Sequence, residues 1–336
     1  MDSDQIIIAH GSGGAQSRTL VRELFAERLK NPALDALGDA ALLTLPSNRI
    51  AFTTDAFVVQ PLVFPGGDIG KLAVCGTIND LAVSGARPLW LSASFIIEEG
   101  TKLALLERIV DSMAAVAREA GVAVVAGDTK VVERSTGNAV YITTAGIGEM
   151  IAKEPLHPGR IRPGDAILIN GTIADHGMAI MTSREGLKLE STIKSDCAPL
   201  GTLAMKLMEA VPDVRFMRDP TRGGLAALLN ETVEGMKFGI EVEEKAIPIN
   251  EATFAACEIL GIDPMHVANE GKLVAVVPAE DAGRALAAMR AHPLGTAAAV
   301  IGRATEDAAG KVVLRTAAGG RRIITMPFGE LLPRIC

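Results

Sequence analysis

The sequence has few aromatic side chains, with one Trp and one Tyr among 336 residues. A protein that binds single-stranded nucleic acid needs such side chains as platforms on which bases stack. The net charge is −7, and no cluster of Lys and Arg is long enough to follow a phosphate backbone. We therefore expect no nucleic-acid partner and a core built from Ala, Val, Leu and Ile.

Long apolar runs are also missing. No stretch of about 18 apolar residues lacks a charge or a turn signal, so no transmembrane helix is predicted. Residues 1–5 contain two Asp and no basic cluster, which is not typical of a signal peptide. The four Cys lie far apart, at positions 75, 197, 257 and 336, and fit neither a disulfide framework nor a zinc site. We expect a cytoplasmic protein with no membrane partner.

Short β-branched runs alternate with helical patterns, which predicts a mixed α/β or α+β fold. The chain is too long for one average core, so two domains are expected. Residues 153–165 (KEPLHPGRIRPGD) hold three Pro and two Gly and are the best candidate for a linker. The predicted organisation is an N-terminal domain of residues 1–152, a C-terminal domain of residues 153–326 and a tail of residues 327–336.

Several segments predict individual elements. Residues 5–10 (QIIIAH) predict a strand. Residues 17–29 predict a helix that places Leu20, Leu24, Phe25 and Leu29 on one face. Residues 68–86 predict a second helix with Asp68 as its N-cap, and its Ala and Gly content indicates close packing. Further helices are expected over 103–121 and 282–290, and strands over 122–132, 138–150, 166–171 and 271–278.

Four aspartates of the first half lie at the end of, or inside, apolar segments. A carboxylate in such a place is costly unless it is paired, caps a helix or binds a cation. Mg²⁺ prefers hard oxygen ligands and usually shares them with nucleotide phosphates. For any one of these residues, the cap of a helix or turn is the simpler explanation. Together they make a metal site a competing hypothesis, and they are Asp39, Asp55, Asp80 and Asp128.

Two glycine-rich loops precede predicted helices. Such loops offer backbone N–H groups and a helix N-terminus to an anion. Neither loop matches the P-loop or the dinucleotide fingerprint, so an ordinary turn or helix start is an equal alternative. The residues are His10, Gly11, Gly13 and Gly14 in HGSGG, and Asp219, Thr221 and Gly223 in DPTRGG.

Three further residues are candidates for chemistry. Lys130 either points to solvent or, if it points inward, clamps a phosphate or carries a proton. Glu270 is either an ordinary loop acid or a functional carboxylate ahead of a buried strand. Cys336 is either a stray thiol or a covalent carrier on an arm that Pro327 and Pro333 restrict, because a thiol is partly ionised near neutral pH.

Together these motifs resemble a known family. HGSGG, PGGDIGKLAVCGTINDLAVSGARP, AGDTKVV, DPTRGGL, NEG and the closing PRIC resemble the hydrogenase maturation proteins of the HypE family, the carbamoyl dehydratases. The resemblance runs from the first predicted strand to the last residue. Its most specific part is the terminal Pro-Arg-Ile-Cys, because the wider superfamily of ATP-dependent synthases and kinases does not carry it.

The resemblance implies a two-domain fold like that of aminoimidazole ribonucleotide synthetase (PurM-like), with a homodimer formed through a β-barrel across the two-fold axis. It implies ATP and Mg²⁺ as cofactors, with the metal near the four aspartates of the first domain. Lys71, Asp128 and the two glycine loops are implied at the nucleotide.

The implied reaction uses the chain's own last residue. Cys336 would receive a carbamoyl group from the carbamoyltransferase HypF and, with ATP, dehydrate it to an S-cyanide. The HypC–HypD complex would take the cyanide as a ligand for the iron of [NiFe]-hydrogenase. Lys130 and Glu270 are implied in positioning and proton transfer. Two alternatives are a small-molecule kinase of the same superfamily, which has no need for a terminal thiol, and a non-catalytic scaffold, which has no need for the acids.

Overall fold

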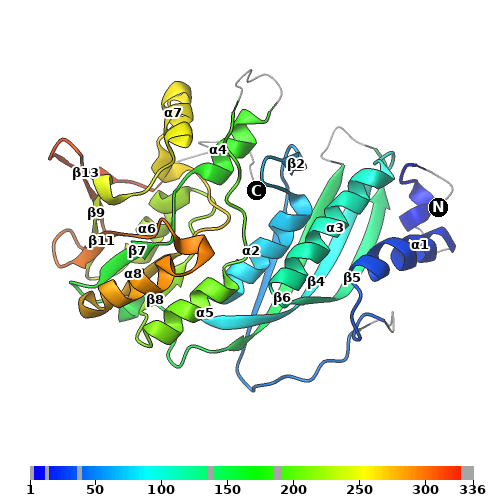
Figure 1. Cartoon of the computed structure of the whole chain (residues 1–336), viewed down its shortest axis with the longest axis horizontal. Helices are drawn as coiled ribbons and strands as arrows, with labels where there is room; N and C mark the ends of the chain where they lie inside the picture. The colour runs from blue at the N-terminus through cyan, green and yellow to red at the C-terminus, as the bar shows by residue number, and fades with distance from the viewer. Residues whose placement is uncertain (1–3, 12–14, 36–39, 135–138, 185–190, 327–336) are drawn as a thin grey trace.

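A four-stranded sheet forms the first half of the molecule (Figure 1). The computed structural model describes residues 4–11, 15–35, 40–134, 139–184 and 191–326. The strands β1 (Ile50–Phe57), β4 (Ala86–Glu98), β5 (Ala123–Val132) and β6 (Val140–Met150) lie in the order β1-β6-β4-β5. A short hairpin, β2 (Val63–Phe64) and β3 (Gly67–Asp68), leads into helix α2 (Ile69–Val83). Helix α3 (Leu103–Glu119) packs beside α2, and α1 (Ala15–Leu20) continues into a π-helical turn, Val21–Ala26.

Helix α2 lies against the sheet and α3 because its small residues allow a close approach. Asp68 caps it as predicted, accepting hydrogen bonds from the N–H groups of Gly70 and Lys71. A Cβ at Gly70 would lie 2.2 Å from the carbonyl oxygen of Ile109 in α3, so only glycine fits there. The predicted close packing of this helix is confirmed.

A seven-stranded sheet forms the second half, in the order β13-β12-β9-β11-β7-β10-β8. Its strands are β7 (Ala166–Ile169), β8 (Phe216–Arg218), β9 (Gly239–Glu243), β10 (Val274–Val277), β11 (Ala299–Thr305), β12 (Val312–Arg315) and β13 (Arg321–Ile324). Its helices are α4 (Asp175–Thr182), α5 (Gly201–Ala210), α6 (Gly224–Val233), α7 (Glu251–Leu260) and α8 (Ala282–Arg290). Short 3₁₀ helices cover Ile8–Gly11, Pro158–Arg160, Glu244–Ala246, Pro264–His266, Ala279–Asp281 and Pro293–Gly295.

Both faces of the second sheet are buried at its strands β7 and β10. Alternate side chains of β7 and β10 point to opposite faces, as the pleat requires. Ile167 and Val276 join a core with residues of α6, whereas Leu168 and Val277 join a core with residues of α5 and α8. The buried runs AILI and VAVV are apolar at every position for this reason.

The elements expected from the sequence are present with one exception. The expected strand over residues 5–10 is wrong, because its neighbour is a loop and not a strand. Gln5 forms a single bridge with Lys102, and Ile6 exchanges hydrogen bonds with Gly100 and Thr101. The chain then turns into the 3₁₀ helix that begins at Ile8.

The expected linker lies between the two sheets, since the first ends at Met150 and the second begins at Ala166. The boundary at residues 152 and 153 itself stays a prediction. Within the described ranges, every helix is too short or too polar to span a bilayer.

Candidate functional site

Carboxylates from both halves of the chain line one small cavity of about 50 Å³. Asp55 comes from β1 and Asp80 from α2, and Thr53 on β1 donates a hydrogen bond of 2.8 Å to the Asp80 carboxylate. The second half of the chain contributes the loop after β8 and the loop before β10. The polar residues of the lining are Asp55, Asp80, Asp219, Thr221, Arg222 and Glu270.

These carboxyl groups hold their protons more tightly than exposed ones do. Burial raises the pKa of Asp55, and burial together with the charge of Asp55 raises the pKa of Asp80. Burial and then the charge of Asp80 raise the pKa of Asp219 to about 7. Burial, followed by nearby anionic groups, raises the pKa of Glu270 well above its usual range. Since repulsion contributes to these shifts, a cation in the cavity would stabilise the ionised forms.

The carboxylates of the cavity suit an Mg²⁺ ion that they share with a phosphate group. Carboxylate oxygens suit its hard character, and Mg²⁺ usually takes one or two carboxylates plus waters and phosphates. Within the described residues, no three His, Cys, Asp or Glu side chains form a ready-made metal centre. The arrangement therefore suits a metal that arrives with a phosphate ligand.

Asp128 and Lys130 line a different cavity, of about 340 Å³, together with His10 and Gly11. The Lys130 Nζ lies 3.0 Å from the Asp128 carboxylate, and the two side chains are 64% and 61% exposed. The Lys130 contact holds the pKa of Asp128 below its usual range, although partial burial opposes it. This cavity has an apolar wall that includes Phe25.

The sequence led us to expect the aspartates of the first half in one group, but within one chain those that the structure describes line two separate cavities. Asp55 and Asp80 come together, whereas Asp128 lies apart from them. The strand order explains this, because β1 and β5 form opposite edges of the first sheet. For the same reason Lys130 on β5 and Glu270 line separate cavities.

The remaining candidates take several positions. Lys71 donates a hydrogen bond of 3.0 Å to the carbonyl of Gly66 and lines a third cavity, of about 880 Å³. Gly223, with a φ of 76°, precedes α6, which begins as the glycine-rich loop predicted. Outside the described residues lie Gly13, Gly14, Asp39 and Cys336.

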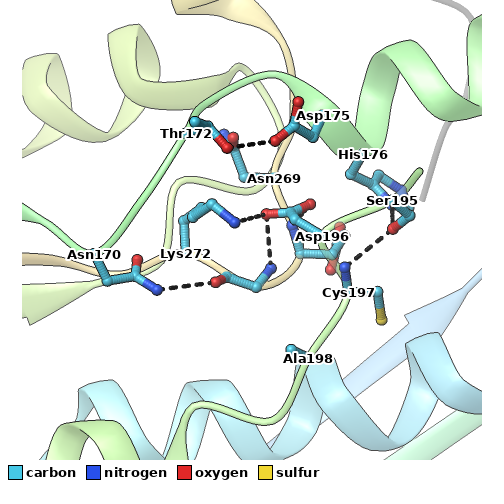
Figure 2. Close-up of polar contacts among 12 residues, drawn as sticks. Asn170, Thr172, Asp175, His176, Ser195, Asp196, Cys197, Ala198, Asn269 and Lys272 are labelled. Atoms are coloured by element: carbon cyan, nitrogen blue, oxygen red, sulfur yellow. Dashed lines mark hydrogen bonds and ion pairs between the residues drawn. The ribbon is translucent and has the colours of Figure 1, made fainter. Parts of the chain in front are cut away.

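Three residues that support the Glu270 loop were not predicted from the sequence: Asn79, Asp196 and Lys272. Asp196 and Lys272 form a buried ion pair of 3.0 Å (Figure 2). A lysine directly before the apolar run of β10 could have signalled a buried cation in need of a carboxylate partner. Nothing in the spacing pointed to Asp196 as that partner.

Comparison with known proteins gives consistent matches. The AIR synthase related protein family matches through its N-terminal domain over residues 37–150 and its C-terminal domain over residues 162–315. Carbamoyl dehydratase HypE of Rhodobacter capsulatus is 52% identical over 336 residues, which span 99% of this chain and 98% of the relative.

Two solved structures extend the comparison. A crystal structure of the hydrogenase maturation protein HypE in complex with ATP has a TM-score of 0.94 at 46% identity, covering 98% of this chain and 99% of that one. A crystal structure of a HypE–HypF complex has a TM-score of 0.80 at 46% identity, covering 94% and 100%. The two-domain fold like that of aminoimidazole ribonucleotide synthetase is confirmed. The chain belongs to the HypE family of carbamoyl dehydratases, hydrogenase maturation proteins within the AIR synthase related proteins.

Proposed function

We propose that the chain uses ATP and Mg²⁺ to dehydrate a carbamoyl group on the sulfur of Cys336 to an S-cyanide. The acid cavity carries this proposal, because it combines a metal-suited pair, Asp55 and Asp80, with the buried Glu270. Membership in a carbamoyl dehydratase family supports the reaction class, and the ATP complex of a relative supports the nucleotide. A small-molecule kinase is the alternative.

The reaction must remove one oxygen and two N–H protons from the carbamoyl group. The oxygen is a poor leaving group until the terminal phosphoryl group of ATP is transferred to it, after which it departs as phosphate. The nitrogen then loses its protons as the C≡N bond forms, which requires a positioned base. The products are the S-cyanide, ADP, phosphate and a proton.

Glu270 is the residue proposed to take a proton. A carboxylate whose pKa lies well above its usual range is a stronger base than an exposed one, and so suits proton transfer near neutral pH. Lys130 is proposed to share positioning and proton transfer. Within one chain it lies in the cavity of His10 and Gly11, where its ammonium suits a phosphate.

Asp55 and Asp80 are proposed to hold Mg²⁺ together with Asp39, which lies outside the described residues, and Asp128 and Asp219 are proposed at the nucleotide. When bound, the metal would neutralise charge on the phosphates during phosphoryl transfer. The N–H groups of the glycine loops, including Gly223 and the loop after His10, would bind phosphate oxygens. Thr221 lines the acid cavity beside Asp219 and would add a hydroxyl donor.

Partner proteins follow from the reaction. The solved HypE–HypF complex of a relative supports HypF as the carbamoyl donor to Cys336. We further propose that a HypC–HypD complex receives the cyanide and that the chain works as a homodimer. Because the carbamoyl group is attached to the chain itself, a high effective concentration replaces ordinary substrate affinity.

Intact-protein mass spectrometry tests the proposal. The chain is carbamoylated by its transferase and then mixed with Mg-ATP. We expect the carbamoylated species to lose about 18 Da, the mass of one water, and Cys336→Ala to show neither modification nor loss. If the carbamoylated mass stays constant while ATP is consumed with a small molecule, the kinase alternative is correct.

A further inference from the structure

The backbone on both sides of Glu270 is fixed by side chains from other parts of the chain. The Asp196 carboxylate accepts hydrogen bonds from the N–H groups of Glu270, at 3.2 Å, and Gly271, at 3.1 Å. Asn79 on α2 donates to the carbonyl of Glu270 at 3.1 Å. Both peptide units that flank the Glu270 Cα are thereby held, so only its side-chain torsions remain free.

Asp196 is an ionised acceptor. Its side chain is 4% exposed and lies 3.0 Å from the Nζ of Lys272, whose side chain is 10% exposed (Figure 2). Burial alone would raise the pKa of the Asp196 carboxyl, but Lys272 and His176 outweigh burial and hold the pKa below its usual range. Hydrogen bonds to an ionised acceptor are stronger than those to a neutral one.

The two segments also touch through their backbones. A Cβ at Gly271 would lie 1.9 Å from the carbonyl oxygen of Asp196, so only glycine allows this contact. The neighbouring Ser195 holds Asp196 in place. Its N–H donates a hydrogen bond of 2.8 Å to the carbonyl of Pro65, and its hydroxyl lies 2.8 Å from the His176 Nδ1. The support for Glu270 thus reaches the first half of the chain.

We propose that Asp196 is a positioning residue for the dehydration, which fixes the two peptide units around Glu270 and so aims its carboxylate into the acid cavity. The inference rests on the proposed function of Glu270 as a base. A purely structural ion pair would be a poor explanation for this arrangement, because buried pairs add little net stability over apolar residues of the same size. The carboxylate contacts to two successive N–H groups are what a positioning role requires.

Asp196→Asn tests the proposal, with Asp165→Asn as its matched control. Asp165 is also a buried aspartate, which accepts a backbone N–H from Arg162 and pairs with Arg215, but it lies away from the acid cavity. Amide hydrogen exchange of the peptide that contains Glu270 and Gly271 is measured first. We expect exchange to be at least about tenfold faster in Asp196→Asn and unchanged in Asp165→Asn.

Single-turnover kinetics of the 18-Da loss are measured on the same proteins. A small displacement of a reacting group costs up to about a hundredfold in rate, so Asp196→Asn should slow dehydration by about 10- to 100-fold. The ATP concentration for half-maximal rate should stay within about twofold, since the Asp196 carboxylate contacts Lys272 and the N–H groups of the Glu270 loop. Asp165→Asn should show neither change.

A double variant, Asp196→Asn with Lys272→Met, separates the effect of Asp196 on the position of Glu270 from its effect on the stability of the protein. Removing the unpaired buried ammonium should restore thermal stability relative to Asp196→Asn, while exchange stays fast and dehydration slow. Unchanged exchange, or full activity despite fast exchange, overturns the positioning role. If the wild type itself shows no 18-Da loss, the proposed function fails, and the exchange comparison still decides whether Asp196 holds this loop.

Discussion

Asp219 differs from a surface aspartate because burial and the charge of Asp80 raise its pKa to about 7. The folded protein therefore binds a proton at this carboxyl where the unfolded chain, with a pKa near 3.8, has lost it. Between about pH 4 and pH 7 the folded state holds more protons, so stability falls as the pH rises through this window and is level above it.

Asp219→Asn should remove this pH dependence. In EDTA, we compare the free energy of unfolding of the variant with that of the wild type at pH 5 and at pH 8. We expect this difference to move in favour of the variant by about 2 to 4 kcal/mol from pH 5 to pH 8, since one pKa unit corresponds to about 1.4 kcal/mol. Urea denaturation at both pH values gives the two differences. The control is Asp307→Asn at an exposed turn, which should show no such gain. Parallel pH curves for Asp219→Asn and the wild type would contradict the pKa shift.

Glu270→Gln keeps the size of the side chain and removes the base. We expect the 18-Da loss to slow by about a hundredfold or more, within the range that general-base catalysis contributes. Thermal stability should be equal or higher at pH 8, because a carboxyl with a raised pKa is costly to ionise in the folded state. Time-resolved intact mass and a melting curve measure both. Wild-type dehydration in the variant would remove Glu270 from the reaction.

At the scale of elements, helix α2 packs in the core of the first half and also contributes residues to the acid cavity. Its N-terminus is capped by Asp68, and its last turns carry Asn79 and Asp80 toward the second half of the chain. Asn79 also donates to the carbonyl of Ala198 and accepts from the N–H of Leu200. The position of this one helix therefore sets the distance between Asp80 and the Glu270 loop.

Asp68→Ala should destabilise the protein by about 1 to 2 kcal/mol, because two N–H groups at the start of α2 lose their acceptor. Urea denaturation measures the change. Lys102 occupies the same position before α3 and makes no capping hydrogen bond, so Lys102→Ala should change stability by less than about 0.5 kcal/mol. Equal losses in the two variants would show that the cap contributes nothing.

The sequence was sufficient to predict helix α2, but it was insufficient to predict the strand order of the sheet on which the helix packs. The Asp68 cap acts within one turn, and the Ala and Gly content of the helix can be read along the chain, so both were predictable, although the contact that Gly70 allows is with Ile109 in α3. The separation of Asp55 from Asp128 depends on strand order, which the spacing of residues along the chain does not specify. Residues 5–10 failed as a strand because a strand needs a partner, and the segment beside them is a loop.

The residues around Glu270 show the same limit. The motif NEG before an apolar run singled out Glu270, but its supports come from α2 and from residues 195–198. Such contacts between distant segments leave no local pattern. Asp196 could be recognised only when the fold placed it under the loop.

For the whole molecule, the first sheet has an apolar face away from α2. Phe52 is 67% exposed, Ile50 43% and Ile96 45%. Exposed apolar patches of this kind mark interaction surfaces, and β1 is also an edge strand. This face suits the homodimer proposed above.

Phe52→Lys should convert the dimer into a monomer, because it places a charge on that face. Light scattering coupled to gel filtration should give 35.1 kDa for the variant and about twice that for the wild type. Phe254→Lys on α7, where the side chain is 46% exposed, should leave the wild-type mass unchanged. A dimeric Phe52→Lys protein would place the interface elsewhere.

The acid cavity draws its walls from both halves of the chain, and this restricts how the two halves can evolve. A change of helix α2 at Asn79 or Asp80 alters the same site as a change at Asp196 or Glu270. A substitution on one side of the cavity therefore needs a compatible residue on the other side to keep the geometry of the site. A chimera that joins the first half of one family member to the second half of another will fold more readily than it works, and its recovery will require matched replacements across the junction.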